Sequence, residues 1–475
     1  MGEEISTVRF CADDRRRFAE RLRTETVLLR QWFDEGRFSE DGFVLGFELE
    51  ACLLDHNGHP ANINERLLET FDDPDVVPEL SRFNVEFNCM PQPAQGRALR
   101  LAERDLSGLW ARCNRVAHGL DANIVMIGTL PTVRESDLTL AAISPMKRYY
   151  ALNSAVLRQR HGRPLHIDIE GVEHLVMDHG DVMLESATTS FQVHLKTPAS
   201  LAHRYLNASM MVSGPVLAVC GNSPFLFGKT LWEETRIPLF EQSVALADEG
   251  GESDAVQRVT FGSGYHTSIG ECLRENVDVY PVLLPIGFDE PPQRFRHLRL
   301  HNGTIWRWNR PLVGFEANGR PHFRIEHRIL PSGPTFPDML ANAALYLGLV
   351  HHVVTTGMDA RDELDFAAVR ANFYTAARHG LKAELVWPGT DRVRADVLLR
   401  EQLIPAARAG LAGLGIDAGD REHYLNIIAA RVQSGQTGSV WQRAALEAAG
   451  GDVLKMMAAY CERQRSGVPV HEWML

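Results

Sequence analysis

The fold prediction starts from one segment whose polarity alternates every second residue, Phe43-Val-Leu-Gly-Phe-Glu-Leu-Glu-Ala-Cys-Leu-Leu54. Side chains point to opposite faces along a β-strand, so the apolar odd-numbered positions predict a buried face. The even-numbered face carries Glu48 and Glu50, whose carboxylates project to one side roughly 7 Å apart. Like charges so placed repel each other unless a cation or hydrogen-bond donors lie between them. Taken alone, the stretch also fits a strand with one solvated face.

Three further segments, 82–89, 190–196 and 322–330, repeat this alternation. Each has a largely apolar odd-numbered face and an even-numbered face of carboxylate, imidazole, amide or guanidinium groups. Those polar faces include Asn84, Glu86, Gln192, His194, Arg324, Glu326 and Arg328. A merely solvated sheet more often shows Lys, Thr and Ser. We therefore expect the four segments to form one mainly antiparallel sheet whose polar face is an active site.

Composition narrows the class of protein. The chain has 475 residues and a net charge of −12, which argues against nucleic acid as a partner because phosphate backbones need clustered Lys and Arg. No run approaches the roughly 18 apolar residues of a membrane span, and the acidic start lacks an apolar signal region. The seven cysteines form no C-x-x-C pair, which fits a reduced compartment. We expect a cytoplasmic protein that acts on small molecules, with a homo-oligomer left open.

Helical periodicity predicts helices over 13–36, 99–120 and 201–219, with a short buried strand at 123–128. We expect 143–180 to be a loop-rich excursion beside the active site and 248–252 to be a mobile surface loop. From residue 338 onward helices are expected at 340–356, 366–385, 393–411, 421–432 and 440–464. The predicted domains are an N-terminal helix at 1–39, a catalytic domain at 40–337, and a helical C-terminal lobe at 338–475 packed on it.

Several familiar motifs are excluded. Six residues, including Pro224, separate Gly221 from Gly228, where a P-loop needs four. Neither a G-x-S-x-G elbow nor an H-E-x-x-H pair occurs. The remaining polar set is dominated by carboxylates, which select Mg²⁺ or Mn²⁺ over zinc. Arg324 and Arg328 add cations that suit phosphate oxygens, so the set indicates phosphoryl transfer from ATP. A same-face salt-bridge ladder is the alternative interpretation of Arg324, Glu326 and Arg328.

Six segments then resemble a known family when they are read in order. They are Gly46-Phe-Glu-Leu-Glu50, the pair Glu79 and Glu86, Met146-Lys-Arg-Tyr149, Thr189-Ser-Phe-Gln-Val-His194, Asn222-Ser-Pro-Phe225 and Ile325-Glu-His-Arg328. Over roughly 40–335 they are similar to the bacterial and plant-type glutamate–cysteine ligases and their carboxylate–amine ligase relatives. The resemblance implies an α+β, glutamine-synthetase-like fold, with a curved, mainly antiparallel sheet flanked by helices. To this fold the chain adds the helical C-terminal lobe.

The resemblance also implies roles for individual residues. The metal ligands for Mg²⁺ would be Glu48, Glu50, Glu79, Glu86 and Glu326. ATP would meet Gln192, His194 and Arg328, and the catalytic set would be Arg328, His194 and Arg324. Substrate-binding candidates are Asn84, Arg148 and Arg236, since an arginine fork matches a carboxylate and Arg148 and Arg236 are available cations. Each of these two arginines also fits an ordinary salt bridge.

The chain departs from the family pattern in two places. The family more often has an apolar residue where His327 stands, although position 327 faces the apolar side and also fits a core histidine. The segment Trp306-Arg-Trp-Asn-Arg310 is consistent with a subgroup that has its own substrate. These departures bear on the identity of the second substrate more than on the reaction that the family catalyses.

The predicted function is therefore an ATP- and Mg²⁺-dependent ligase that acts through an acyl phosphate. It would join a carboxylate, expected to be the γ-carboxylate of glutamate, to an amine such as that of cysteine. Two alternatives remain at this stage: a phosphotransferase of the same fold, and a catalytically silent nucleotide-binding or assembly protein.

Overall fold

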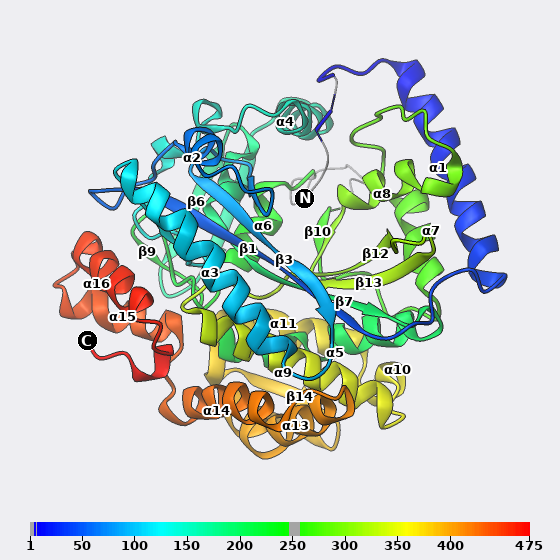
Figure 1. The fold of residues 1–475 in the computed structure, drawn as a ribbon. Helices are drawn as coiled ribbons and strands as arrows, with labels where there is room; N and C mark the ends of the chain where they lie inside the picture. Colours follow the sequence, from blue (N-terminus) through cyan, green and yellow to red (C-terminus); the bar gives the residue numbers. More distant parts are fainter. Residues whose placement is uncertain (1–3, 6, 247–256) are drawn as a thin grey trace.

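The computed structural model describes residues 4–5, 7–246 and 257–475. Within these residues the largest sheet has seven strands in the order β12-β13-β7-β1-β3-β2, with β4 paired to the far end of β1. Every pairing in it is antiparallel, and the sheet curls across the middle of the molecule (Figure 1). Its strands are β1 Val44–Asp55, β2 Val76–Pro78, β3 Asn84–Pro93, β4 Ala122–Val125, β7 Phe191–Thr197, β12 Asn309–Phe315 and β13 Pro321–His327. The four predicted strand segments therefore lie in one sheet, which confirms the predicted fold class.

The alternation of β1 determines what each face of the sheet contacts. The odd-numbered side chains of β1 from Leu45 to Leu53 are buried and join the main hydrophobic cluster, whereas Glu48 and Glu50 are only half-buried. Phe47 stacks against Phe191 of the neighbouring strand with ring centroids 5.5 Å apart. Burying an aromatic side chain of this kind contributes about 2 to 3 kcal/mol relative to exposure. This apolar face holds the sheet in register, and that register places the polar side chains on the other face.

Two buried helices, α5 Ala202–Cys220 and α9 Phe336–Thr355, supply most of the core beside the apolar face. Thr335 begins α9 by accepting a hydrogen bond from the backbone N–H of Asp338. Gly348 of α9 lies directly against the backbone of Ala407 in α13 Ile404–Gly413, so a Cβ at position 348 would clash. Further helices that complete this layer are α3 Ala98–Gly119, α11 Phe366–His379 and α14 Ala418–Ser434 (Figure 1).

The helix predictions near the N-terminal half are confirmed, but the loop-rich interpretation of 143–180 is wrong. That stretch forms helix α4 Lys147–Gln159 and a hairpin of β5 Leu165–Glu170 and β6 His174–His179. Leu165, Ile167 and Ile169 are buried while the residues between them are exposed, so a strand period is present. The helices α1 Ala12–Asp34, α3 and α5 match their predictions within two residues at each end. The predicted surface loop 248–252 lies outside the described residues.

The C-terminal region is largely helical, with two corrections. The predicted helix over 366–385 ends at His379 and is followed by a hairpin of β14 Glu384–Trp387 and β15 Thr390–Arg394. Its turn contains Gly389 with φ +79°, a conformation that glycine adopts without strain. The predicted helix over 440–464 is two helices, α15 Gly438–Ala448 and α16 Val453–Ser466, separated where Gly450 and Gly451 take positive φ. The predicted domain boundary at 338 stays a prediction.

The remaining elements are short and connect these layers. They are α2 Asn64–Phe71, the 3₁₀ turn η3 Val182–Ala187, β8 Phe225–Leu226, β9 Lys229–Thr230, α6 Arg236–Ser243, β10 Val259–Thr260, α7 Ile269–Val279, α8 Arg296–Gly303, β11 Trp306–Arg307, α10 Ala360–Glu363, α12 Ala395–Leu398 and the π turn Leu399–Leu403. Among the helices of the described ranges, none has the length and apolar character needed to cross a bilayer.

Candidate active site

Strand register brings polar side chains into rows across the sheet. Glu326 of β13 lies opposite His194 of β7 on one side and opposite Arg310 of β12 on the other. Glu48 lies opposite Gln192, which places the carboxylate of β1 beside the amide of β7. One rung further along β1, Glu50 pairs directly with Glu86 of β3. Like charges directly opposite on neighbouring strands destabilise a sheet, so the Glu50–Glu86 pair indicates a site built for cations.

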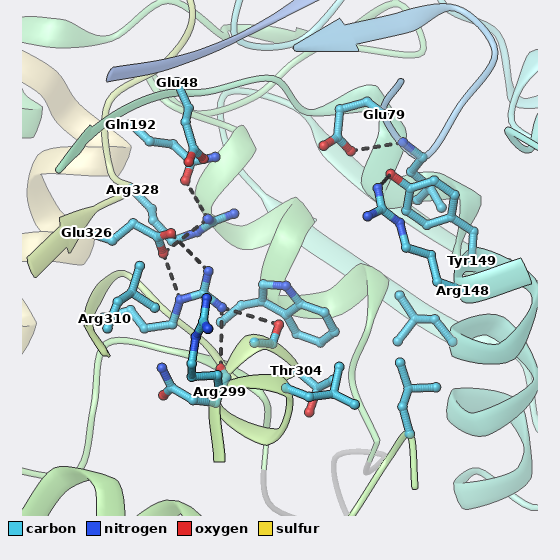
Figure 2. A pocket seen from close by; sticks show the side chains of 18 of the residues that line it. Glu48, Glu79, Arg148, Tyr149, Gln192, Arg299, Thr304, Arg310, Glu326 and Arg328 are labelled. Carbon is cyan, nitrogen blue, oxygen red and sulfur yellow. Dashed lines mark hydrogen bonds and ion pairs between the residues drawn. The ribbon is translucent and has the colours of Figure 1, made fainter. Parts of the chain in front are cut away.

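These side chains, except that of His194, line a cavity of about 350 Å³. Its polar lining consists of Glu48, Glu50, Glu79, Glu86, Arg148, Glu185, Gln192, Arg296, Arg299, Arg310, Arg324, Glu326 and Arg328, together with Glu4 and smaller polar residues. In Figure 2 the labelled side chains form two groups, with Glu326, Arg310 and Arg328 in one and Glu79 with Arg148 in the other. The cavity therefore has a basic end and an acidic end.

At the basic end Glu326 is held by two arginines. Arg310 donates to it through Nε at 2.7 Å and Nη2 at 3.0 Å, and Nη1 of Arg328 lies 3.2 Å away. Burial raises the pKa of Glu326, but Arg310 and Arg328 outweigh burial and bring this pKa down to about 2. The pKa of Arg328 is raised by Glu326, Glu50 and Glu48 despite its burial. The alternative interpretation, a salt-bridge ladder of Arg324, Glu326 and Arg328, is therefore present in part. Glu326 pairs with Arg328 and with Arg310 of β12, whereas Arg324 contacts His194.

Glu48 and His194 continue the row from the basic end. Nε2 of His194 lies 3.2 Å from a carboxylate oxygen of Glu48 and 4.0 Å from one of Glu326. Arg324 donates to Nδ1 of His194 at 3.3 Å, which leaves Nε2 facing the two carboxylates. Burial raises the pKa of Glu48, but His194 and Arg324 lower it well below its ordinary value. Glu48, His194 and Glu326 each offer a ligand atom within 4.8 Å of the others, a spacing that suits one metal ion.

The acidic end has more carboxylates than cations. Burial and repulsion from Glu50 raise the pKa of Glu79 to about 7. Burial and the charges of Glu48 and Glu79 raise the pKa of Glu86 well above its ordinary value. Burial and the charges of Glu79 and Glu50 likewise raise the pKa of Glu185 well above its ordinary value. Carboxylates that resist ionisation for this reason gain a counter-charge when a hard divalent cation binds. The donor set formed by Glu50, Glu79 and Glu86 at this end therefore fits Mg²⁺ or Mn²⁺.

Gln192 connects the two ends. Its Nε2 donates to Glu50 at 2.8 Å, and its Oε1 accepts a hydrogen bond from Arg328 at 2.6 Å. Glu50 also accepts from the backbone N–H of Ser190 at 2.7 Å, while burial raises its pKa against the opposing charge of Arg328. This chain of hydrogen bonds fixes the orientation of the amide and of both charged groups.

Not every predicted site residue lies in the cavity. Arg148 does, and its Nη2 donates to the hydroxyl of Tyr149 at 2.6 Å. Asn84 lies outside the cavity lining, is buried, and hydrogen-bonds Ser81 and Asn64. Arg236 is also buried outside the lining and donates to Glu234 and to the backbone carbonyls of Arg328 and Ile329. A substrate-binding role for Asn84 or Arg236 therefore has no support from its position.

His327 has protein partners on the apolar side of β13. Its Nδ1 lies 2.7 Å from the amide oxygen of Asn309, and its ring stacks on Tyr346 with centroids 3.7 Å apart. It is fully buried, as the interpretation of a satisfied core histidine expects. The departure from the family pattern at this position is therefore outside the cavity.

The sequence did not reveal Arg310, Arg296, Arg299 or Glu185 as cavity residues. Arg310 lies on the edge strand β12, where Pro311 interrupts the alternation that would mark a strand. The sequence also does not predict the apolar wall, whose residues are Ile5, Leu80, Leu152, Val182, Phe240, Val244, Leu284, Ile286, Phe288, Leu298, Leu300, Trp306, Leu312 and Val313. Most of these residues come from loops and helices, where no periodic pattern marks a shared surface.

Comparison with solved structures shows related folds at low sequence identity. The crystal structure of glutamate–cysteine ligase from Francisella tularensis in complex with AMP matches 90% of this chain and 90% of that chain, with a TM-score of 0.53 and 12% identity. The bifunctional glutathione synthetase from Pasteurella multocida matches 93% of this chain with a TM-score of 0.54 and 10% identity. The match covers 54% of that protein, so this chain spans about half its length.

A search of curated protein sequences gives no significant match. The model of glutamate–cysteine ligase family 2 matches residues 44–457, a range that includes the whole seven-stranded sheet and every predicted metal ligand. The chain therefore belongs to glutamate–cysteine ligase family 2.

Proposed function

We propose that this protein is an ATP- and Mg²⁺-dependent ligase that forms an amide bond between a carboxylate and an amine through an acyl phosphate. The observation that carries the proposal is the division of one cavity into a basic end and an acidic end, joined by the Gln192 hydrogen bonds. Membership of the family supports the class of reaction. The AMP in the Francisella enzyme's structure supports the use of an adenine nucleotide.

The carboxylates present fit two cation sites. One would be held by Glu48, His194 and Glu326, whose ligand atoms lie within 4.8 Å of one another. The other would be held by Glu50, Glu79 and Glu86, where the surplus of negative charge is greatest. Bound Mg²⁺ would supply Lewis-acid neutralisation of the phosphate oxygens as charge moves between them.

The arginines of the basic end would hold the phosphates of ATP. Arg328 is the central candidate, because it lines the cavity and its guanidinium is fixed by Glu326 and Gln192. Arg324, held against His194, is a second candidate. An arginine fork contacts two phosphate oxygens at once and is already charged before the reaction begins, so little reorganisation is needed.

The reaction would proceed in two steps. An oxygen of the substrate carboxylate attacks the γ-phosphorus of ATP, the bond to the bridging oxygen breaks, and ADP leaves with that electron pair. The amine nitrogen then attacks the carbonyl carbon of the acyl phosphate, the carbon–oxygen bond to the phosphoryl group breaks, and phosphate leaves. The nitrogen loses its surplus proton to give the amide. Arg328 and Arg324 would stabilise the charge on the transferring phosphoryl group in the first step.

Glutamate is the proposed acid, activated at its γ-carboxylate, and cysteine is the proposed amine. Arg148 lines the cavity beside Tyr149 and Glu79 and would receive the α-carboxylate of an amino acid. The family description supports both substrates.

The test is a substrate assay on the purified protein with Mg²⁺. We expect L-glutamate to stimulate release of ADP and phosphate, and added L-cysteine to give γ-glutamylcysteine by mass spectrometry. Product with glutamate and a different amine would keep the ligase class and replace cysteine. ADP without free phosphate would indicate a phosphotransferase. If no amino acid stimulates ATP hydrolysis in folded protein, the proposal is wrong.

A further inference from the structure

Glu185 lines the cavity but does not belong to the sheet that carries the other acidic ligands. It lies on the 3₁₀ turn η3 Val182–Ala187, immediately before β7. Its side chain is half-buried, and in the described part of the chain its carboxylate has no hydrogen bond or ion pair. The two-cation arrangement proposed above does not use this residue, so its charge needs a separate explanation.

The backbone around Glu185 is firmly held. Asp181 accepts from the N–H of Met183 at 2.9 Å, and Asn153 accepts from the N–H of Val182 at 3.2 Å. The carbonyl of Glu185 itself accepts from both the N–H and the hydroxyl of Thr188, at 2.9 and 2.7 Å. A fixed backbone with an uncommitted carboxylate is the arrangement expected of a residue whose partner is a ligand.

The surroundings of Glu185 indicate the charge of that partner. Glu185 lines the same cavity as Glu79, Glu50 and Arg328. After burial, the charges of Glu79 and Glu50 raise the pKa of Glu185, and Arg328 acts in the opposite direction. A fourth carboxylate at an already acidic end is costly unless a positive group is bound there. Of the proposed reactants, ATP brings phosphates, which the basic end accommodates. L-glutamate brings its reacting carboxylate and an α-ammonium group, but this group is present with every acceptor, so a contact with it would affect amide and hydroxamate formation equally. The acceptor amine, which is an ammonium ion at neutral pH, is the reactant whose reacting group is positive.

We propose that Glu185 binds the ammonium group of the acceptor amine and so selects protonated primary amines as the second substrate. The inference rests on the proposed ligase function and adds a substrate-contacting residue to it. The contact would be a charged hydrogen bond that holds the nitrogen beside the acyl phosphate. One ammonium proton would pass to the Glu185 carboxylate, and the neutral nitrogen would then attack the carbonyl carbon.

Two nucleophiles of different charge test this proposal. Hydroxylamine is uncharged at neutral pH and would trap the acyl phosphate as a hydroxamate without needing an anionic partner, whereas L-cysteine presents an ammonium group. With L-glutamate, ATP and Mg²⁺, Glu185→Gln should raise KM for cysteine at least about tenfold, the effect of losing one charged hydrogen bond. Hydroxamate formation and KM for ATP should remain at the wild-type level.

Glu135→Gln, which changes an exposed carboxylate outside the cavity lining, is the matched control and should leave all three values unchanged. Glu185→Asp, which keeps the charge, should recover part of the affinity for cysteine. Equal losses with both nucleophiles would overturn the inference in favour of a structural role, and unchanged kinetics would overturn it outright. Wild-type protein that forms neither hydroxamate nor amide would remove the ligase proposal and this inference together. If the wild type forms hydroxamate but Glu185→Gln leaves the KM for cysteine unchanged, the inference alone is removed and the ligase proposal stands.

Discussion

Substitution of Glu79 by Gln should stabilise the metal-free protein and weaken its response to Mg²⁺. Burial and repulsion from Glu50 raise the pKa of Glu79 from 4.5 to about 7. The folded state therefore binds this proton more tightly than the unfolded state, so the free energy of unfolding falls as pH rises from 4.5 to 7. At about 1.4 kcal/mol for each tenfold change in proton affinity, the ionised carboxylate costs the folded protein about 3 kcal/mol above pH 7.

Urea unfolding at pH 8 and pH 5, followed by tryptophan fluorescence, measures this difference. In EDTA at pH 8 the Gln variant should be more stable than the wild type by about 3 kcal/mol, and the gain should be smaller at pH 5. The hydrogen bond from the N–H of Leu80, 2.9 Å long, is retained because the amide oxygen of Gln can accept it. Added Mg²⁺ should stabilise the wild type more than the variant, since binding to the folded state alone raises stability.

Glu241 provides the matched control for this experiment. Burial also raises its pKa to about 7, although it accepts hydrogen bonds from Trp308 and Tyr374 and does not line the cavity. Glu241→Gln should therefore change the pH dependence of stability in the same direction while leaving the Mg²⁺ response intact. The reasoning about the acidic end is refuted if Glu79→Gln gives no gain at pH 8 in EDTA, or if Mg²⁺ stabilises it as much as the wild type.

Three further predictions concern the site and the core. Mg²⁺-dependent ATP turnover should fall at least about a thousandfold in each of the variants Glu48→Gln, Glu86→Gln and Glu326→Gln, because a lost metal ligand costs several kcal/mol of transition-state stabilisation. Near-normal turnover in folded variants would show that these carboxylates are dispensable. Arg328→Lys keeps the charge but loses the fork, so steady-state kinetics should show a KM for ATP raised about tenfold; an unchanged KM would remove Arg328 from the phosphate site. Gly348→Ala should lower the melting temperature because the new Cβ would meet the backbone of Ala407. The control Gly108→Ala, in open space on α3, should raise stability by about 0.5 to 1 kcal/mol. Equal shifts in the two variants would contradict the close packing of α9 and α13.

Much of the fold could be predicted because the sheet buries one face completely. Wherever one face of a strand is buried, a period of two is imposed on the sequence, as in β1, where Leu45, Phe47 and Leu49 are buried. The hairpin of β5 and β6 has the same period, but Gly162 and Pro164 are typical of loops, and together with the nearby histidines they favour the incorrect loop prediction for this stretch. At 384–394 the interpretation failed because the Ala- and Leu-rich helix before it hid a short hairpin whose turn depends on Gly389.

The site could be predicted as far as it lies on those strands. Glu48, Glu86, Gln192, Glu326 and Arg328 all line the cavity, because residues two apart on a strand share a face and register then aligns the strands. Side chains that reach the cavity from turns and short helices leave no such pattern. Their placement depends on long-range packing, which a single sequence does not show.

Asn84 and Arg236 are predicted substrate contacts that lie outside the cavity lining. Each has a residue type suited to substrate binding, and Asn84 lies next to a polar strand face. In the fold both side chains satisfy buried protein groups, Asn84 through Ser81 and Arg236 through Glu234. Polar residues near an active site are often used to hold its supporting backbone, and residue type alone does not distinguish that role from contact with substrate.

The central claim is that a carboxylate is activated as an acyl phosphate, and the fate of its oxygen tests this most directly. L-glutamate labelled with ¹⁸O in its γ-carboxylate is incubated with the protein, ATP, Mg²⁺ and L-cysteine, and the released phosphate is examined by mass spectrometry. One ¹⁸O atom should appear in each phosphate formed, in equal amount with the amide product, because the bond that breaks joins the carbonyl carbon to the transferred oxygen. Amide formation with unlabelled phosphate, or phosphate release that glutamate does not stimulate, would contradict the account.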